Sequence, residues 1–338
     1  MNEPQVLVEV TRGPLVENLH RGHAAVVDNS GKLLYSFGDP RFLTYWRSSA
    51  KPVQALPVVE SGAVEHYSIT DRELSLFCAS HNGEAIHTDS VLSVLGKIGL
   101  DLTALQCGMH MPLHNQTTKE MIAVKQEANS LHSNCSGKHS GMLALACHKQ
   151  FDLSTYTELE NPLQQLILDY IADLTGYPRE EILIGIDGCG VPVHGMPLYN
   201  MALAYARMVK PAGMSDTRAA ACRRVSKAMH TYPEMVGGTD RFCTDLMRAT
   251  GGKLIAKGGA GGVYCVGVYG SGLGIAVKCE DGFGKARDAA VVEILRQLRV
   301  LDAAELEALA TYHKPVNKNH RGDICGEYRP VVKLTKED

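Results

Sequence analysis

Segments with strand character stand at both ends of the chain and enclose a middle with helical character, and this order constrains the fold most. Residues 6–12, 23–28 and 33–37 are rich in apolar and β-branched side chains, and the glycine-rich stretch 251–284 repeats that pattern between tight turns. An antiparallel sheet built from both chain ends, with helices packed on it, satisfies this order. The sequence therefore predicts an α/β fold of the α+β kind, with a helical subdomain.

Several elements of the middle have recognisable ends. Asn161 and Pro162 begin a helix that continues to residue 174, Gly99 ends a helix over 88–98, and Thr117 precedes Glu120 by three residues in capping-box order. Further helices are predicted from about residue 49 and over 142–147, 198–208, 216–230 and 285–299, and a strand over 73–79 leads into the polar turn 80–83.

The length of 338 residues fits one large unit, and 45% apolar with 21% charged residues is typical of a globular protein. We expect a single unit over residues 1–338. Within it, residues 1–80 and 251–338 are expected to form the sheet, and residues 81–250 a mainly helical part. No Pro-rich or Ser-rich linker separates the two parts, so the sequence defines no sharp boundary between them.

The net charge of −3 gives no long-range attraction to nucleic acid or to an acidic membrane surface. No run of 18 apolar residues occurs, and the first residues lack the basic start and apolar centre of a signal peptide, so a cytoplasmic location is expected. The ten cysteines are scattered, which favours reduced thiols over a disulfide framework. The expected partner is a small molecule.

A serine and a lysine three residues apart, Ser48 and Lys51, share one face of the predicted helix. A serine hydroxyl is a poor nucleophile, and a shielded lysine nearby can accept its proton. The residues after Lys51 are largely apolar, so this lysine is expected to be buried. Ser49 is the alternative nucleophile, but it lies two residues before Lys51 and points away from it on a helix.

Two later motifs extend this pattern. Ser80 opens a Ser-x-Asn turn, and Lys257 precedes two glycines that allow close approach of the backbone to a ligand. The order Ser-x-x-Lys, Ser-x-Asn, Lys-x-Gly is similar to that of serine β-lactamases and penicillin-binding proteins, with His81 and Gly258 as departures. Lys253, four residues earlier, is the alternative to Lys257.

Two cysteines stand in glycine-rich segments of the middle. Cys135 lies in the segment 134–141, before the apolar helix 142–147, and Cys189 lies in the turn 185–192. Two thiolates with one further donor and a water make a tetrahedral zinc site, and the candidate companions are His139, Lys138 and Asp187. Both cysteines are expected in exposed turns, and the alternative to a metal site is that they are ordinary thiols in these glycine-containing turns.

These motifs together resemble the asparaginase II family, the class 3 or Rhizobium etli-type L-asparaginases. The resemblance is carried by the segments 47–52, 79–84, 134–139 and 187–192, and it extends from residue 10 to residue 259. It implies a serine β-lactamase/penicillin-binding-protein-like fold, a homodimer and hydrolysis of L-asparagine to L-aspartate and ammonia. By the same resemblance the catalytic residues are Ser48, Lys51, Ser80 and Lys257. One zinc ion per chain is implied on Cys135, Lys138 and Cys189.

The remaining polar residues of these motifs are candidates for substrate binding. Arg47 suits the substrate α-carboxylate and Asp187 its α-ammonium group, while His81, Asn82 and His139 would orient the reacting groups. Each has a structural alternative, as a paired arginine or a satisfied loop histidine. A zinc ion on two thiolates is already charge-neutralised, so we assign it to shaping the pocket rather than to supplying the nucleophile.

Two other function classes remain open at the level of sequence. A β-lactamase-like serine amidase or a glutaminase would use the same nucleophile on a different amide. A non-catalytic zinc-binding or redox-sensing protein would need only Cys135 and Cys189. Loss of function in Ser48→Ala separates the enzymes from the sensor.

Overall fold

The computed structural model describes residues 3–338, which divide into two compact units. The first, here called the sheet unit, comprises the chain up to Ser49, Met196–Lys210 and Asp245–Asp338. The second, the helical unit, comprises Ala50–Gly195 and Pro211–Thr244. Within the described residues, no helix combines the length and the apolar character needed to cross a membrane.

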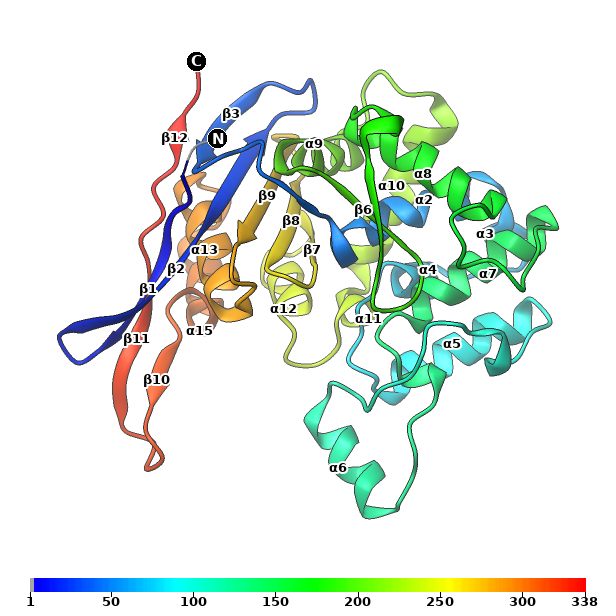
Figure 1. The fold of residues 1–338 in the computed structure, drawn as a ribbon, viewed down its shortest axis with the longest axis horizontal. Helices are drawn as coiled ribbons and strands as arrows, with labels where there is room; N and C mark the ends of the chain where they lie inside the picture. The colour runs from blue at the N-terminus through cyan, green and yellow to red at the C-terminus, as the bar shows by residue number, and fades with distance from the viewer. Residues whose placement is uncertain (1–2) are drawn as a thin grey trace. The chain divides into compact units, whose positions relative to one another are not determined.

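The sheet unit contains an antiparallel sheet formed from both ends of the chain, as predicted (Figure 1). Among residues 3–338 it has nine strands, with the main order β10-β11-β1-β2-β9-β8-β7 and with β3 pairing both β2 and β12. Their bounds are β1 Gln5–Arg12, β2 Leu15–Val27, β3 Leu33–Phe37, β7 Leu254–Gly258, β8 Val263–Val268, β9 Leu273–Cys279, β10 Val316–Lys318, β11 Ile324–Pro330 and β12 Thr335–Lys336. The predicted strands near the N-terminus and in 251–284 are confirmed.

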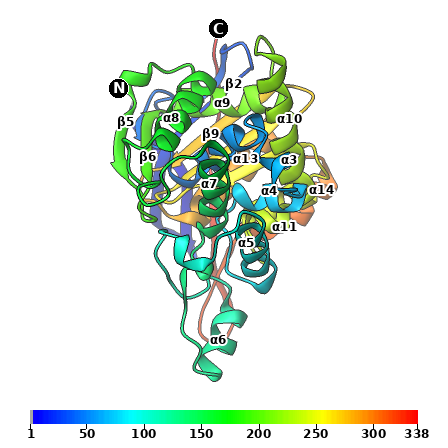
Figure 2. The same ribbon diagram turned by 90° about the vertical axis from the view of Figure 1, so that its right-hand side faces the viewer.

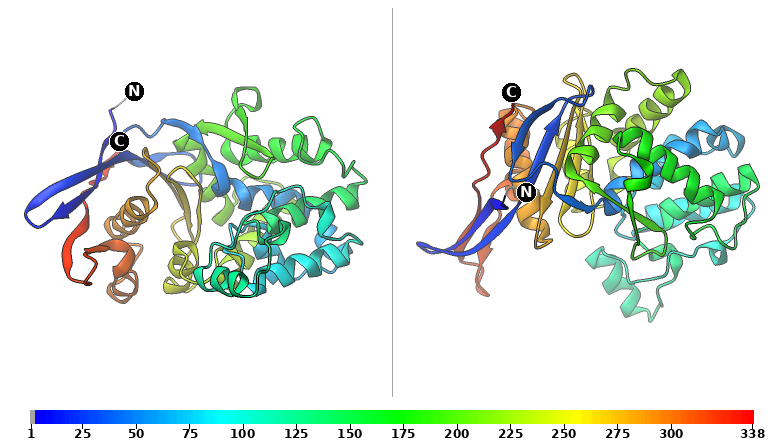
Figure 3. Two further views of the ribbon diagram at one scale, coloured as in Figure 1. Left: turned by 60° about the horizontal axis from the view of Figure 1, so that its bottom comes forward. Right: turned by 45° about the horizontal axis from the view of Figure 1, so that its top comes forward.

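Two helices cover the central strands of this sheet. Helix α9 (Leu198–Val209) and helix α13 (Gly284–Gln297) both pack on β8 and β9, from opposite faces (Figure 3). Gly274 permits the close approach of α9, because a Cβ there would lie 1.9 Å from the carbonyl oxygen of Ala202. The short helices α14 (Ala303–Ala308) and α15 (Ala310–His313) follow α13.

The helical unit is built mainly from short and medium helices (Figure 2). They are α1 Lys51–Gln54, α2 Leu56–Glu60, α3 Ala63–His66, α4 Asp71–Phe77, α5 Ala85–Lys97, α6 Asn115–Ala123, α7 Ser136–Lys149, α8 Pro162–Thr175, α10 Asp216–Thr231 and α11 Pro233–Val236. Strand β5 (Leu183–Ile186) pairs antiparallel with β6 (Pro192–Pro197), from Leu183 opposite Gly195 to Ile186 opposite Pro192. Two further elements, β4 (Leu43–Tyr45) and α12 (Phe242–Ala249), complete the chain.

The prediction of a strand over 73–79 is wrong, because this segment is helix α4. A capping box begins the helix: Thr70 accepts from the Glu73 N–H at 3.3 Å, and Glu73 Oε2 accepts from the Thr70 N–H at 2.8 Å. Residues Glu73 to Phe77 are all buried, so the segment lacks the polar face that marks a surface helix. A short apolar run of this kind does not distinguish a buried helix from a strand.

Three other local predictions need correction. Helix α7 begins at Ser136, so much of the predicted loop 134–141 is helical. The N-cap of α6 is His114, whose side chain accepts from the Thr117 N–H, and Thr117 lies inside the helix. The helix predicted from about residue 49 is a 3-10 turn, Arg47–Ala50, followed by the separate short helices α1 and α2.

Candidate functional site

The Ser-x-x-Lys motif begins in the sheet unit with the 3-10 turn Arg47–Ala50. Arg47 has φ of +51°, a left-handed backbone conformation that costs energy for a residue with a Cβ and is enriched at functional sites. Ser48 is half-buried, whereas Ser49 is fully buried and its hydroxyl donates to the carbonyl oxygen of Lys257 at 3.0 Å. The two adjacent serines therefore differ: Ser49 is committed to a structural hydrogen bond, and Ser48 is accessible.

The predicted Lys-x-Gly motif lies against this turn. Lys257, at the end of β7, is only 1% exposed, and its Nζ donates to the carbonyl oxygen of Gly258 at 2.7 Å. A Cβ at Gly259 would lie 3.0 Å from Ser49 Oγ and 3.0 Å from the Trp46 carbonyl oxygen, so glycine allows the close approach. The structure thus brings the Lys257 motif to the serine turn within one unit.

Lys253, the alternative to Lys257, has a different environment. Its side chain is about half exposed, and its Nζ pairs with Glu305 at 2.7 Å and with Asp302 at 3.4 Å. Ion pairs made by a half-exposed lysine are ordinary surface contacts. The buried position of Lys257 favours it over Lys253 as the functional lysine.

In the helical unit, Lys51 begins α1 and is 1% exposed. Its Nζ donates to the Ala79 carbonyl oxygen at 2.5 Å, to Ser80 Oγ at 3.0 Å and to Cys135 Sγ at 3.2 Å. In the ammonium form all three N–H groups have an acceptor, and the neutral amine keeps two of these hydrogen bonds and has a lone pair that can accept a proton. The buried lysine predicted from the sequence is therefore confirmed, and it connects the Ser-x-Asn turn to the first cysteine motif.

Two further residues of the Ser-x-Asn turn are held rigidly. The Ser136 hydroxyl donates to the Leu131 carbonyl oxygen, so His81 Nε2 donates to Ser136 Oγ at 2.9 Å, and the His81 ring stacks on that of His87 at 4.9 Å. Burial lowers the pKa of His81 well below its usual range, and the nearby His87 lowers it further, so the ring is neutral at pH 7. Among residues 3–338, His81 Nδ1 has no hydrogen-bond partner.

Asn82 is anchored by the segment 238–239 of the helical unit. Its side-chain amide donates to the Thr239 carbonyl oxygen at 3.1 Å, and a Cβ at Gly238 would lie 2.3 Å from its Oδ1. Gly238 also has φ of +100°, which only glycine adopts without strain. This close packing fixes the direction of the Asn82 amide.

The two predicted cysteine motifs meet around a second buried lysine. Lys138 Nζ donates to Cys189 Sγ at 3.0 Å, and Cys135 and Cys189 are hydrogen-bonded to each other. Both cysteines are buried, so the prediction that they lie in exposed turns is wrong. The cause is local: Cys135 caps the buried start of α7, and Cys189 faces it from the turn before β6.

The charges in this cluster are coupled. The hydrogen bond from the Cys189 thiol holds the pKa of Cys135 well below its usual range, with Lys51 and Lys138 lowering it further, whereas the same hydrogen bond and burial raise the pKa of Cys189. Burial opposes a charge on Lys138, but the sulfur atoms outweigh it and raise its pKa. These shifts favour a thiolate at Cys135, a thiol at Cys189 and an ammonium group at Lys138.

Two sulfur atoms and one nitrogen at hydrogen-bonding distance form a donor set that fits a tetrahedral zinc ion with one open position. A thiolate is already present, and the remaining two donors would each release a proton on binding. Soft sulfur donors select zinc over magnesium or calcium. The residues Cys135, Lys138 and Cys189 thus satisfy the chemistry of a zinc site.

His139 lies one residue after Lys138 on α7 and is fully buried. The Tyr156 hydroxyl accepts from the Gln106 N–H at 2.8 Å and lies 2.7 Å from His139 Nδ1, which assigns the ring proton to Nε2. Within the described residues, that Nε2 has no partner. Burial, with Lys138 as the next cause, keeps the pKa of His139 well below its usual range, so it is a neutral hydrogen-bond donor.

His194 is a residue that sequence reasoning missed. It lies on β6, it is buried, and in the part of the chain that the structure describes neither ring nitrogen has a hydrogen-bond partner. Burial lowers its pKa to about 4, and Lys138 lowers it further while Asp187 opposes this. Asp187 is half-buried and its Oδ1 accepts from the Gly188 N–H at 2.8 Å. The signal in the sequence was a histidine in an otherwise apolar run five residues after Cys189.

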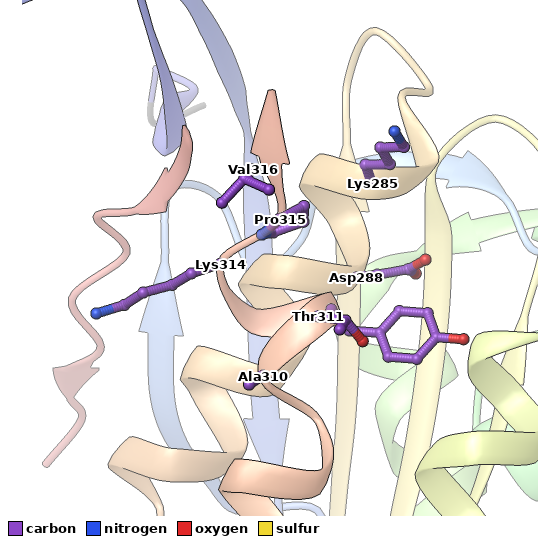
Figure 4. A pocket seen from close by; sticks show the side chains of 8 residues that line it. Lys285, Asp288, Ala310, Thr311, Lys314, Pro315 and Val316 are labelled. Carbon is purple, nitrogen blue, oxygen red and sulfur yellow. The ribbon is translucent and has the colours of Figure 1, made fainter. Parts of the chain in front are cut away.

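An open pocket of about 490 Å³ lies elsewhere, within the sheet unit (Figure 4). Its lining comes from α13, α15 and the start of β10, with Lys285, Asp288 and Tyr312 among its polar residues. It includes none of the site residues predicted from the sequence. The buried polar clusters, rather than this pocket, carry the candidate chemistry.

Comparison with known proteins assigns the chain to a family. Among solved structures, it resembles a β-lactamase from Mycobacterium bovis, with 14% identity, coverage of 86% of this chain and 95% of that chain, and a TM-score of 0.41. It also resembles Mglu in its native form, with 13% identity, coverage of 84% of this chain and 62% of that chain, and a TM-score of 0.38. No curated protein matches. The model of the L-asparaginase II family matches residues 8–330, so the chain belongs to the L-asparaginase II family and is an amidohydrolase of the asparaginase type.

Proposed function

We propose that this protein hydrolyses L-asparagine to L-aspartate and ammonia through a serine nucleophile activated by lysine. The observation that carries the proposal is Lys51, whose buried Nζ lies 3.0 Å from Ser80 Oγ and which follows Ser48 by three residues. A buried lysine costs desolvation energy, and its three hydrogen bonds fix one position for the nitrogen. This is the preparation that a general base needs.

In the proposed first step, neutral Lys51 accepts the proton of Ser48 while Ser48 Oγ attacks the side-chain amide carbon of asparagine. A C–O bond forms, the C–N bond breaks, and a proton passes to the departing nitrogen, which leaves as ammonia. Ser80 is the proposed relay, because its Oγ accepts a hydrogen bond from Lys51 Nζ at 3.0 Å, so it can take a proton from Lys51 and pass its own hydroxyl proton to the departing nitrogen. Water then hydrolyses the ester, returning the proton to Ser48 and releasing L-aspartate.

Lys257 is the proposed electrostatic partner of the nucleophile. Its carbonyl oxygen accepts the Ser49 hydroxyl at 3.0 Å, and Gly259, two residues later, packs on the serine turn, which supports a role beside Ser48. A cation near developing negative charge stabilises the transition state most in a site that excludes water. We propose that Lys257 serves in this way during both acyl transfer steps.

The substrate's α-carboxylate and α-ammonium groups are assigned to Arg47 and Asp187. Arg47 has a strained backbone conformation. Such a conformation persists only where the surrounding structure fixes it, which is suitable for a side chain that must bind in one orientation. His139 offers an unpartnered N–H, and we propose that it orients the substrate together with His81 and Asn82. An aspartate that binds the ammonium group would favour free asparagine over amides without an α-amine.

We propose one zinc ion per chain on Cys135, Lys138 and Cys189. When bound, it would hold these three residues together and so shape the pocket. Lys51 connects this cluster to Ser80, because its Nζ also contacts Cys135 Sγ at 3.2 Å. Loss of the ion is therefore expected to disturb the position of Lys51 without removing the nucleophile.

We also propose a homodimer. Strand β5 is an edge strand of the described residues, and it exposes Leu183, Ile184 and Ile186, the last with 84% of its surface accessible. An uncovered apolar edge strand can pair with another chain, and natural proteins cover such edges or place charged side chains on them. A second copy of the chain is the proposed cover.

The test is ammonia release from L-asparagine and L-glutamine by the purified protein, with bound zinc counted and with Ser48→Ala as the matched variant. Release from asparagine that is lost in Ser48→Ala supports the proposal. Release from glutamine alone, or turnover of a chromogenic lactam, moves the assignment to a glutaminase or a β-lactamase-like serine amidase. No release from either amide, with zinc bound at one per chain, favours a zinc-binding or redox-sensing protein.

A further inference from the structure

We propose that His20, Cys279 and Asp281 form a second metal site, in the sheet unit, that binds a divalent transition metal such as zinc. Their ligand atoms, an imidazole nitrogen, a thiol sulfur and a carboxylate oxygen, all lie within 4.8 Å of one another. None of these residues belongs to the serine, lysine or cysteine motifs discussed above. The site therefore goes beyond the proposed asparaginase chemistry and is independent of it.

The pairing of β2 with β9 builds this cluster. Gly22 lies opposite Cys279, and the Glu280 N–H donates to the Arg21 carbonyl oxygen at 2.9 Å, which continues the antiparallel ladder by one residue. His20 and Gly22 share one face of β2, because side chains alternate along a strand, and Asp281 lies in the turn that follows Cys279, the last residue of β9. The strand pairing and this turn together bring the three side chains close to one another.

Hydrogen bonds already join the three ligands through the carboxylate. Asp281 Oδ2 lies 2.6 Å from His20 Nδ1, and the Cys279 thiol donates to Asp281 Oδ1 at 3.1 Å. The carboxylate thus faces a ring nitrogen and a thiol that each carry or exchange a proton. A divalent cation can take the place of these protons, since the same three atoms that share them can ligate it.

The surroundings hold the ligands in position. The His20 ring stacks on Phe283 with a centroid separation of 4.8 Å and an interplanar angle of 4°, and Tyr328 lies parallel to it at 6.3 Å. The Phe283 N–H donates to Asp281 Oδ1 at 3.0 Å. Supporting contacts of this kind orient metal ligands and are as necessary to a metal site as the ligands themselves.

The donor set determines which ion fits. One nitrogen, one sulfur and one oxygen are borderline to soft donors, which favour zinc, cobalt or copper over magnesium and calcium. Three protein ligands leave one position of a tetrahedron for water, and Asp281, with 47% of its side chain exposed, leaves the site open to solvent. On binding, the Cys279 thiol releases its proton, and neutral His20 carries its remaining proton on Nε2.

The experiment uses the full-length protein stripped of metal and titrated with Zn²⁺ against a chromogenic chelator, and with Co²⁺ followed by thiolate-to-cobalt absorption. Cys279→Ser and Asp281→Asn test the new site, Cys135→Ser removes the proposed first site, and Cys325→Ser is the matched control in the same unit. Circular dichroism verifies that each variant is folded. Asp281→Asn lies at the exposed edge of the cluster, so it remains informative if Cys279→Ser does not fold.

We expect the wild type and Cys325→Ser to bind one equivalent more than Cys279→Ser or Asp281→Asn at equal free metal. Cys135→Ser should retain the equivalent held by Cys279, with its thiolate-to-cobalt band. Metal uptake that is unchanged by Asp281→Asn and Cys279→Ser would overturn the proposal. If Cys135→Ser alone loses metal, the first site stands and the second does not, so failure of either site is recognised separately.

Discussion

The adjacent serines Ser48 and Ser49 allow one prediction that tests the assignment of the nucleophile directly. Ser49→Ala removes a buried hydroxyl that donates to the Lys257 carbonyl oxygen at 3.0 Å, so we expect the free energy of unfolding to fall by about 1–2 kcal/mol. Ser48 is half-buried, and Ser48→Ala should change stability by no more than about 0.5 kcal/mol. The two variants should affect activity in the opposite order: Ser48→Ala should lower kcat/KM by at least about 10³-fold, and Ser49→Ala by less than about 10-fold.

Two measurements separate these effects. Ammonia release from L-asparagine gives kcat/KM, and urea unfolding gives stability, followed by circular dichroism and by the fluorescence of Trp46, the chain's single tryptophan, which is buried next to the serine turn. The decisive result is which variant loses activity and which loses stability. A folded Ser49→Ala protein without activity, beside a Ser48→Ala protein that retains it, would refute the assignment and make Ser49 the nucleophile.

Two further predictions concern stability and assembly. Burial alone would raise the pKa of Glu293, but hydrogen bonds from Arg296 and His313 lower it to about 2. Because the folded pKa lies below the ordinary value of 4.5, Glu293 stabilises the fold above about pH 4.5, by roughly 2–3 kcal/mol, and this contribution is lost as the pH falls toward 2. Urea unfolding between pH 3 and 7 should therefore show a smaller stability difference between wild type and Glu293→Gln at low pH, and a constant difference would contradict the reasoning. Ile186→Lys should convert the proposed dimer to a monomer, as measured by light scattering. Activity is measured alongside at equal chain concentration. The same mass for both proteins would exclude β5 as the interface.

Much of the fold could be predicted because its signals are local. Asn161 and Pro162 define the start of α8, and the apolar, β-branched runs between the tight turns of 251–284 predict the strands seen as β7, β8 and β9. Helix α4 was mistaken for a strand because a helix buried on all sides shows no amphipathic pattern. Its capping residues Thr70 and Glu73 were present in the sequence and carried the correct signal.

The candidate site shows the limit of local signals more clearly. Spacing predicts that Ser48 and Lys51 act together, whereas the metal site on Cys135 and Cys189 is a hypothesis from residue type and from the family resemblance. The contact of Lys51 with Cys135 joins residues 84 positions apart, and no local pattern encodes it. The same holds for His194, whose burial without a hydrogen-bond partner depends on how β6 packs.

Lysine is an unusual zinc ligand because it must give up its proton, and the charges around Lys138 indicate how this exchange is balanced. Without metal, the Cys135 thiolate and the Lys138 ammonium group cancel each other, and Cys189 is a neutral thiol. With a divalent ion bound, two thiolates cancel the ion's charge and the amine is neutral, so the buried net charge of these groups is zero in both states. Two protons must then leave for each ion that binds.

This balance makes metal affinity strongly dependent on pH. The apparent affinity should fall by about 100-fold for each unit by which the pH decreases, as long as Cys189 and Lys138 are protonated in the metal-free protein. Calorimetry in two buffers of different ionisation enthalpy, carried out with Cys279→Ser to isolate the first site, counts the protons released. A count near two supports Lys138 as a ligand. A count near one means that only Cys189 gives up its proton and that Lys138 remains an ammonium group beside the ion.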